Sequence, residues 1–115
     1  MILWLKFKGV KMEVLNYKGS RIRTIFKGDK IYMSAGDMAK AIDMSNGRIT
    51  RLYLAEGEMT TIELPTPGGI QPVRMIETMG IVKVLGRSKK PESSQFLQWF
   101  FDIIINRREE ACSIR

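Results

Sequence analysis

The most informative stretch of the chain is RIRTIFKGDKIYMSAGDMAKAIDMSNGRITRLYL, residues 21–54. Apolar and polar side chains alternate over residues 21–26, which is the pattern of a half-buried β-strand. A second β-prone run over residues 30–33 follows Gly28, and glycine can take the positive φ of a tight turn. We therefore expect a hairpin that places Arg21 and Arg23 on one face of its first strand.

After this hairpin the hydrophobic period changes from two residues to that of a helix. Ser34 followed by Asp37 matches a variant of the capping box, in which the hydroxyl and the carboxylate accept hydrogen bonds from amides left free at a helix start. This pattern predicts a helix over about residues 35–42. Ser45 offers a second N-cap before another amphipathic run over residues 48–54.

Two short helices joined by a turn of about three or four residues form a helix-turn-helix, whose second helix can enter the DNA major groove. Asp43 lies in the turn, where a glycine is preferred, although aspartate tolerates left-handed backbone. The start of the second helix has a composition suited to DNA, because asparagine can bind adenine edges and arginine can bind guanine edges or phosphates. These candidate DNA-binding residues are Ser45, Asn46, Arg48, Thr50 and Arg51. The alternative is an amphipathic core helix whose polar side is merely solvated.

The remaining chain predicts a second hairpin and two more helices. Residues 59–64 and 70–76 surround a cluster of chain breakers, and Pro72 predicts that the return strand is an edge strand or starts late. Further helices are expected from about Glu77 to Gly86 and from Pro91 to about residue 110. The fold class is therefore α+β: a small single domain with two β-hairpins, a helix-turn-helix-like pair and a long C-terminal helix.

Length and composition exclude several classes of protein. A chain of 115 residues can bury one core of ordinary size. One cysteine and no histidine exclude an internal disulfide, Cys/His zinc sites and histidine bases, so we expect no cofactor and no metal. The longest apolar runs are too short to span a bilayer, and a cytoplasmic location follows as an expectation.

Positive charge is concentrated in the first half of the chain. The net charge is +7, and residues 1–51 hold 11 lysines and arginines against 4 acids, which accounts for all of it. An acidic partner, above all nucleic acid, would explain this asymmetry, whereas the alternative is a solubilising surface. A second basic cluster, Arg87, Lys89 and Lys90, lies just before a helix start that favours an anion, although hydrated loop charges would look the same.

The last helix is apolar nearly all round. One side of it packs into the core, and the other predicts a homodimer contact or a docking site for another protein, unless the whole helix is buried within the domain. The candidate interface residues are Leu97, Phe101, Ile104 and Ile105.

Four segments and two aromatic residues form a further pattern: residues 17–23, 31–42, 75–80 and 87–92, followed by Phe96 and Trp99. Together they resemble the BRO-N domain, the N-terminal module of baculovirus repeated-open-reading-frame proteins and of many bacteriophage antirepressors. The resemblance implies a compact α+β DNA-binding module of phage, prophage or large-virus regulators. It covers residues 12–110, with residues 1–11 as an added strand or a tail and residues 111–115 as a tail. The order Glu77-Thr78-Met79-Gly80 departs from the usual Glu-Ser-Gly pattern. Members of the family usually continue into a C-terminal effector domain, and here we expect the N-terminal module alone.

Three functions follow as hypotheses. The first is a DNA-binding transcription regulator, acting on duplex rather than single-stranded DNA in the bacterial host cytoplasm or nucleoid, with the basic hairpin and loop on phosphates and the short helix at base edges. The second is an antirepressor that binds a phage repressor through the exposed apolar C-terminal helix. The third, a metal-dependent nuclease, is disfavoured because its acids lack a diagnostic spacing, and we expect no enzyme. Its residues would be Glu56, Glu58 and Glu63.

Overall fold

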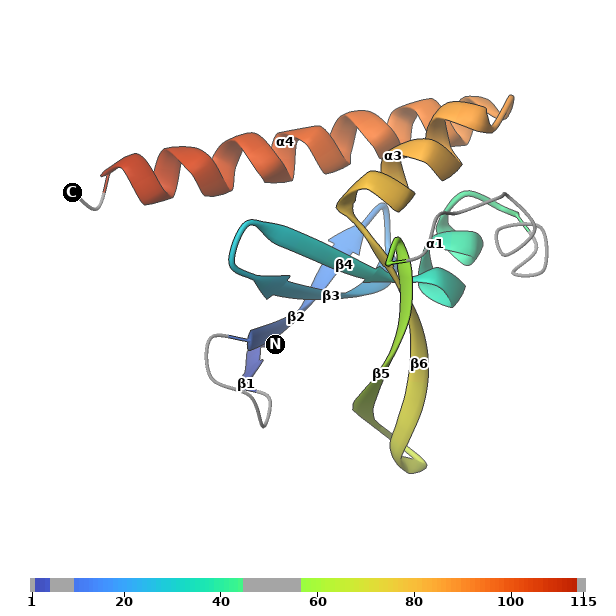
Figure 1. Ribbon diagram of the computed structural model, residues 1–115. Helices are drawn as coiled ribbons and strands as arrows, with labels where there is room; N and C mark the ends of the chain where they lie inside the picture. The colour runs from blue at the N-terminus through green and yellow to red at the C-terminus, as the bar shows by residue number, and fades with distance from the viewer. Residues whose placement is uncertain (1, 5–9, 45–56, 114–115) are drawn as a thin grey trace.

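The computed structural model of the protein describes residues 2–4, 10–44 and 57–113, and it describes side-chain surroundings within residues 12–44 and 57–106. Strands and helices are combined in one α+β domain, as the sequence predicted (Figure 1). The elements are β1 (Ile2–Trp4), β2 (Val10–Tyr17), β3 (Ser20–Lys27), β4 (Lys30–Ser34), α1 (Ala35–Ala41), β5 (Met59–Thr66), β6 (Gly69–Glu77), α3 (Thr78–Arg87) and α4 (Pro91–Ser113).

The described strands form one antiparallel sheet of six strands in the order β1-β2-β3-β4-β6-β5. Both predicted hairpins are confirmed. In the β3–β4 hairpin Lys27 lies opposite Lys30, and Gly28 between them has a φ of 61°. In the β5–β6 hairpin Met59 lies opposite Ile76 at one end. The turn glycine and the chain breakers therefore placed both hairpins correctly.

Pro72 lies within β6, so the predicted late start of this strand is wrong. The edge position is correct in a local sense, because β4 pairs only with residues 75–77 of β6. Among the described strands, β5 is the single hydrogen-bonded neighbour of residues 69–74. A proline without an N–H donor is tolerated there because the other side of the strand needs no ladder bond.

The hairpin of β2 and β3 was missed by the sequence reasoning. β2 pairs with β3 from Val10 opposite Lys27 to Tyr17 opposite Ser20. The turn between them contains Lys18 and Gly19, both with positive φ (49° and 87°), as in the primed turns that suit a hairpin. Residues 2–4 add β1 beside β2, so this part of the N-terminal extension is an added strand.

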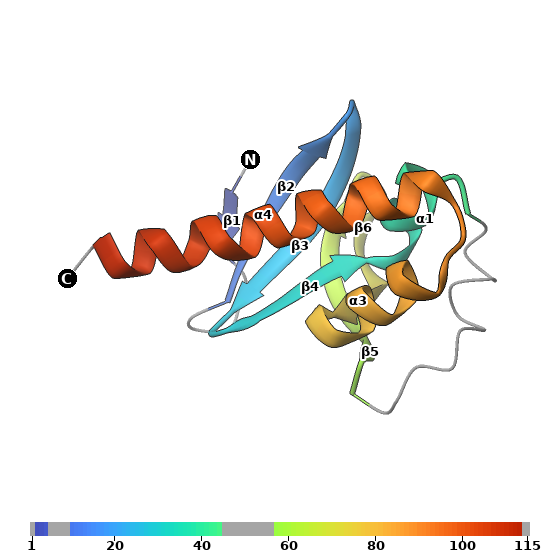
Figure 2. The ribbon, with the colours of Figure 1, turned by 90° about the horizontal axis from the view of Figure 1, so that it is seen from above.

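Two apolar clusters hold the layers together. Helices α3 and α4 cover one face of the sheet, and α1 packs at its side (Figures 1 and 2). The larger cluster lies beneath these helices and includes Ile22, Met33, Ile76, Met38, Ile42, Ile81, Val84, Phe96 and Phe100. A smaller cluster of Met12, Ile25, Leu64 and Met75 joins β5 and β6 to β2 and β3. Burying each large side chain contributes about 1.5–3 kcal/mol, so α4 is fixed to the sheet chiefly through its two buried phenylalanines.

The helix starts follow the predicted caps with one exception. The Ser34 hydroxyl accepts a hydrogen bond from the Asp37 amide at the start of α1, as predicted. The Asp37 carboxylate does not accept from the start of its own helix, so the reciprocal half of the capping box is wrong; this carboxylate binds Arg23. Pro91 is the first residue of α4, as expected.

Candidate nucleic-acid interface

An ion pair fixes the N-terminal end of α1 to β3. The Asp37 Oδ2 accepts hydrogen bonds from the Arg23 amide (2.9 Å) and Nε (2.8 Å), and Oδ1 accepts from Nη2 (3.1 Å). Nη2 also donates to the Ser34 hydroxyl (3.2 Å). The hydrogen bond to Asp37 raises the pKa of Arg23 above its ordinary value. Arg23, which the sequence predicted to contact DNA, therefore also positions α1.

A second contact holds the C-terminal end of α1. Lys90 Nζ, just before α4, donates a hydrogen bond to the Asp43 carbonyl and lies 3.6 Å from Asp43 Oδ2. Asp43 has a φ of 53°, which confirms that it takes left-handed backbone after the helix. The Met44 amide then donates to the Ala39 carbonyl (2.8 Å). Lys90, also assigned to DNA by the sequence, anchors this turn to the loop before α4.

We call these two contacts, Arg23 with Asp37 and Lys90 with Asp43, the α1 clamp. They tie the short helix to β3 at one end and to the loop before α4 at the other. A helix of seven residues has little stability of its own, so its orientation depends on such contacts and on its buried side chains. The second helix of the predicted pair, with Ser45, Asn46, Arg48, Thr50 and Arg51, lies outside the described residues, and the helix-turn-helix therefore stays a prediction.

Exposed cations surround the α1 clamp. Arg21, Lys40 and Lys89 are exposed, and each lies within three residues of a clamp member in the chain. None of the three forms an ion pair within the part of the chain that the structure describes. Arg87 is exposed as well. By the same criterion the acids near the clamp are Asp37, Asp43 and Glu92, so cations outnumber acids in these segments.

The predicted interface residues of α4 separate into two groups. Leu97 and Ile104 are partly buried against the larger cluster. Phe101 and Ile105 are 43% and 52% exposed, one helical turn apart. The second pair is the more exposed of the two, on a helix that extends beyond the sheet toward its C-terminal end (Figures 1 and 2).

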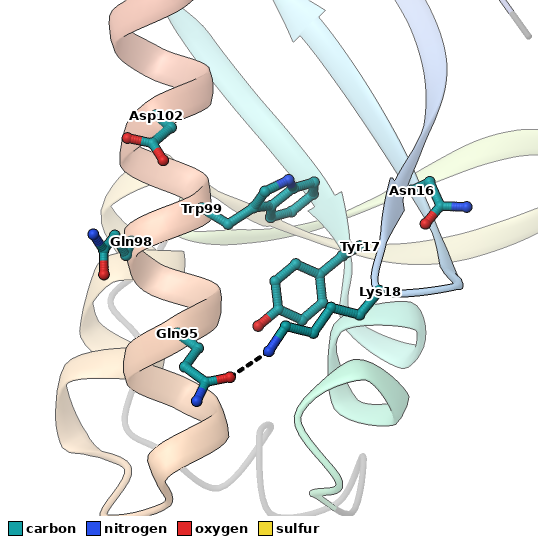
Figure 3. Close-up of a pocket in the computed structure, with 7 residues that line it drawn as sticks. All are labelled: Asn16, Tyr17, Lys18, Gln95, Gln98, Trp99 and Asp102. Atoms are coloured by element: carbon teal, nitrogen blue, oxygen red, sulfur yellow. Dashed lines mark hydrogen bonds between the residues drawn. The ribbon is translucent and has the colours of Figure 1, made fainter.

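A hollow of about 410 Å³ between the β2–β3 turn and α4 was not anticipated from the sequence (Figure 3). The Tyr17 ring lies 4.9 Å from the Phe96 ring and 5.0 Å from the Trp99 ring, between centroids. Lys18 Nζ donates to Gln95 Oε1 at the rim of the hollow. The paired aromatic rings and this hydrogen bond fasten the turn to α4, and the signal in the sequence was Tyr17-Lys18-Gly19, which is a hairpin turn after an alternating run.

The acids of the nuclease hypothesis do not form a described cluster. Glu58 Oε1 accepts a hydrogen bond from Lys83 Nζ of α3, and Glu63 is exposed on β5. Glu56 lies outside the described residues. Within residues 12–44 and 57–106, no group of three metal-ligating side chains is present. None of the described helices is long and apolar enough to cross a membrane.

Comparison with models of protein families matched residues 21–106 to the model described as BRO family, N-terminal domain. Comparisons with curated proteins and with solved structures returned no match. The matched region runs from β3 into α4 and contains both contacts of the α1 clamp.

Proposed function

The chain belongs to the BRO family, and on that premise we propose that it is a DNA-binding regulatory module of the phage, prophage or viral type. The N-terminal domain of this family is of the type found in phage antirepressors and DNA-binding regulators. The observation that carries the proposal is the α1 clamp with unneutralised cations around it. Arg21, Lys40 and Lys89 contact phosphates, while Arg23 and Lys90 hold α1 in place.

The cations have two different roles, which depend on whether a carboxylate is bound to them. A cation that a carboxylate already holds contributes little net attraction for a phosphate, but it fixes the element that carries its neighbours. Exposed cations without an acid partner keep their charge for counterion release on DNA. Residues Asn46 to Arg51 begin five positions after the end of α1 and supply the base contacts in this proposal.

Salt dependence of duplex binding tests the proposal. With the three phosphate contacts of Arg21, Lys40 and Lys89, the slope of log K against log salt is about −2.7. The variant Lys40→Ala/Lys89→Ala removes two of them and is expected to reduce the slope to about −0.9. The charge-matched control is Lys27→Ala/Lys30→Ala, because these exposed lysines face each other at the tip of the β3–β4 hairpin, away from α1 (Figure 2).

The control is expected to keep the slope and affinity of the unmodified protein. Equal losses in both double variants would mean that net charge alone governs binding, and the proposed surface would be wrong. Absent binding at low salt, or binding that salt does not weaken, would reject DNA as the partner. Single-stranded DNA of the same sequence is expected to compete less well than duplex.

Base contacts are tested separately with Arg48→Ala/Arg51→Ala. If these arginines reach base edges, the variant loses discrimination between a selected site and random duplex, with about 1–3 kcal/mol lost for each contact. If they contact only phosphates, affinity falls equally for both sequences and the slope decreases. Unchanged binding to both would remove residues 45–51 from the interface.

A second candidate function, an antirepressor that binds a repressor protein, is favoured by the exposed pair Phe101 and Ile105 on α4. In this case the protein releases a phage repressor from its operator in a gel-shift assay. Phe101→Glu/Ile105→Glu is expected to abolish the release, whereas the exposed control Gln98→Glu keeps it. Release by the double glutamate variant would exclude this surface.

A further inference from the structure

A second hollow, of about 270 Å³, lies between the start of α1 and the β5–β6 hairpin. Arg23 and Ser34 line it from one side, and Thr66, Gln71 and Arg74 line it from the other. Gln71 and Arg74 are exposed, so the hollow is open to solvent. It borders residues 69–74 of β6, the part of that strand that pairs only with β5.

Arg23 and Arg74 line this hollow, and both have N–H donors without a partner among the described residues. Asp37 and Ser34 accept from Nε and Nη2 of Arg23, and Nη1 has no hydrogen-bond partner among the described residues. The bidentate pair with Asp37 fixes the plane of the guanidinium, which lowers the entropy lost when a further group binds. Arg74 forms no ion pair in the described part of the chain, and its cross-strand neighbour is Thr61.

The chemistry of the lining selects an oxyanion. Arg74 offers a planar N–H fork, and Arg23 offers the two N–H groups of Nη1. Gln71 offers an amide, and the nearby carboxylate of Asp37 is already bound by Arg23. Arginine forks match phosphate oxygens in a bidentate geometry, and a tetrahedral anion can accept from both sides of the hollow at once. A cation would meet two positive charges there and is excluded.

We propose that Arg23 and Arg74 form a phosphate clamp that holds one backbone phosphate of the bound DNA. This inference rests on the proposed function and extends its surface from α1 onto the β5–β6 hairpin, beside which α1 lies (Figure 1). Arg23 belongs to both clamps, so one side chain positions α1 and contacts the nucleic acid with its remaining nitrogen. Arg74 supplies the charge that Asp37 cancels at Arg23.

Arg74 gives the sharper test because Arg23→Ala would also break the α1 clamp. Arg74→Ala is expected to weaken duplex binding about fivefold to tenfold at moderate salt and to reduce the salt slope by about 0.9, at any DNA sequence. Arg74→Lys keeps the slope and loses part of the affinity, since lysine lacks the planar fork. Lys27→Ala, an exposed cation at the far tip of the β3–β4 hairpin, is the control and is expected to change binding less than twofold. Thermal unfolding of each variant checks that it is folded.

Two outcomes overturn the phosphate clamp while the protein still binds DNA. One is an Arg74→Ala variant with the affinity and slope of the unmodified protein. The other is an equal loss in Lys27→Ala, which would show that any surface cation counts alike. The first result leaves the proposed surface around α1 intact, whereas the second would count against that surface as well. DNA binding itself stands in both cases.

Inorganic phosphate tests whether the hollow binds an anion, independently of DNA as the source of the phosphate. At constant ionic strength, phosphate is expected to raise the unfolding temperature of the unmodified protein but not that of Arg74→Ala, because only the former holds the anion. If the protein fails to bind DNA, the proposed function is wrong, and DNA is not the source of the phosphate. Stabilisation of the unmodified protein, but not of Arg74→Ala, by inorganic phosphate would then still show that the anion site exists. No difference between the two proteins in phosphate would overturn the site itself.

Discussion

Gly80 shows how a single residue determines the packing of α3. A Cβ at this position would lie 2.7 Å from Ile76 Cγ2 and 2.8 Å from the Glu58 carbonyl oxygen. That carbonyl also accepts a hydrogen bond from the Glu77 amide (2.8 Å). Glycine therefore lets the backbone before β5 approach the start of α3, which explains a position that the sequence marked only as a departure from a family pattern.

Gly80→Ala is expected to destabilise the protein by about 1–3 kcal/mol, because the backbone oxygen of Glu58 cannot move aside without breaking its hydrogen bond. Gly86→Ala is the matched control in the same helix. A Cβ at Gly86 meets nothing within 4 Å, so alanine is expected to stabilise α3 by about 0.5–1 kcal/mol. Chemical denaturation measures both, and changes of the same sign would contradict this account.

The ion pair of Arg23 with Asp37 is the other contact at this scale. Both side chains are partly buried (30% and 15% exposed) and share two side-chain hydrogen bonds. A double-mutant cycle with Arg23→Ala and Asp37→Ala is expected to give a coupling free energy of about 1–2 kcal/mol, between that of exposed pairs and that of buried charged hydrogen bonds. A coupling near zero would show that the α1 clamp does not hold the helix.

The pH dependence of this pair follows from the raised pKa of Arg23. A group whose folded pKa lies above its unfolded value contributes stability that is complete below the unfolded pKa and lost only as pH rises through the folded one. Both values for arginine lie far above neutral pH. The destabilisation caused by Arg23→Ala is therefore expected to be equal at pH 7 and pH 9, and a loss of the effect by pH 9 would contradict the assignment.

At the scale of elements, local signals predicted what local chemistry determines. Gly28 placed the β3–β4 turn, Ser34 placed the start of α1, and Pro91 placed the start of α4. β2 was missed although residues 10–14 alternate and Lys18-Gly19 supplies a turn. Only its first two residues belong to the predicted extension, and no element was predicted for residues 12–17. The Asp37 carboxylate was predicted to cap its own helix, but it pairs with Arg23 of β3 instead. This contact depends on a residue of another element, so no local sequence pattern predicts it.

Helix α4 carries the remaining prediction at this scale, a homodimer. Phe101 and Ile105 lie one turn apart and expose apolar surface, so self-association would bury them. Sedimentation is expected to show a dimer that Phe101→Glu/Ile105→Glu converts to a monomer without loss of stability. Gln98→Glu, on the same helix and exposed, serves as the control. A monomer at all concentrations would reject the homodimer and leave the pair to another partner.

At the scale of the whole molecule, the sequence shows where the cationic residues are, but it does not show which of them contact an acid or a carbonyl in the folded chain. Arg23 and Asp37 are 14 residues apart, and Lys90 and the Asp43 carbonyl are 47 apart, so their contacts arise only when the chain has folded. Arg74 was overlooked for the same reason: its nearness to Arg23 depends on how the β5–β6 hairpin lies against the start of α1. The sequence thus predicts which residues are cationic, while the fold determines which of them remain available to an anion.

The most direct test of a DNA-binding surface around α1 is a titration of duplex DNA into isotope-labelled protein, followed by amide chemical shifts. The account predicts shifts concentrated at β3 near Arg21 and Arg23, α1, residues 46–51, Arg74 and Lys89, with Phe101 and Ile105 unaffected. Shifts concentrated on the exposed side of α4, or spread evenly with no maximum at α1, would contradict it.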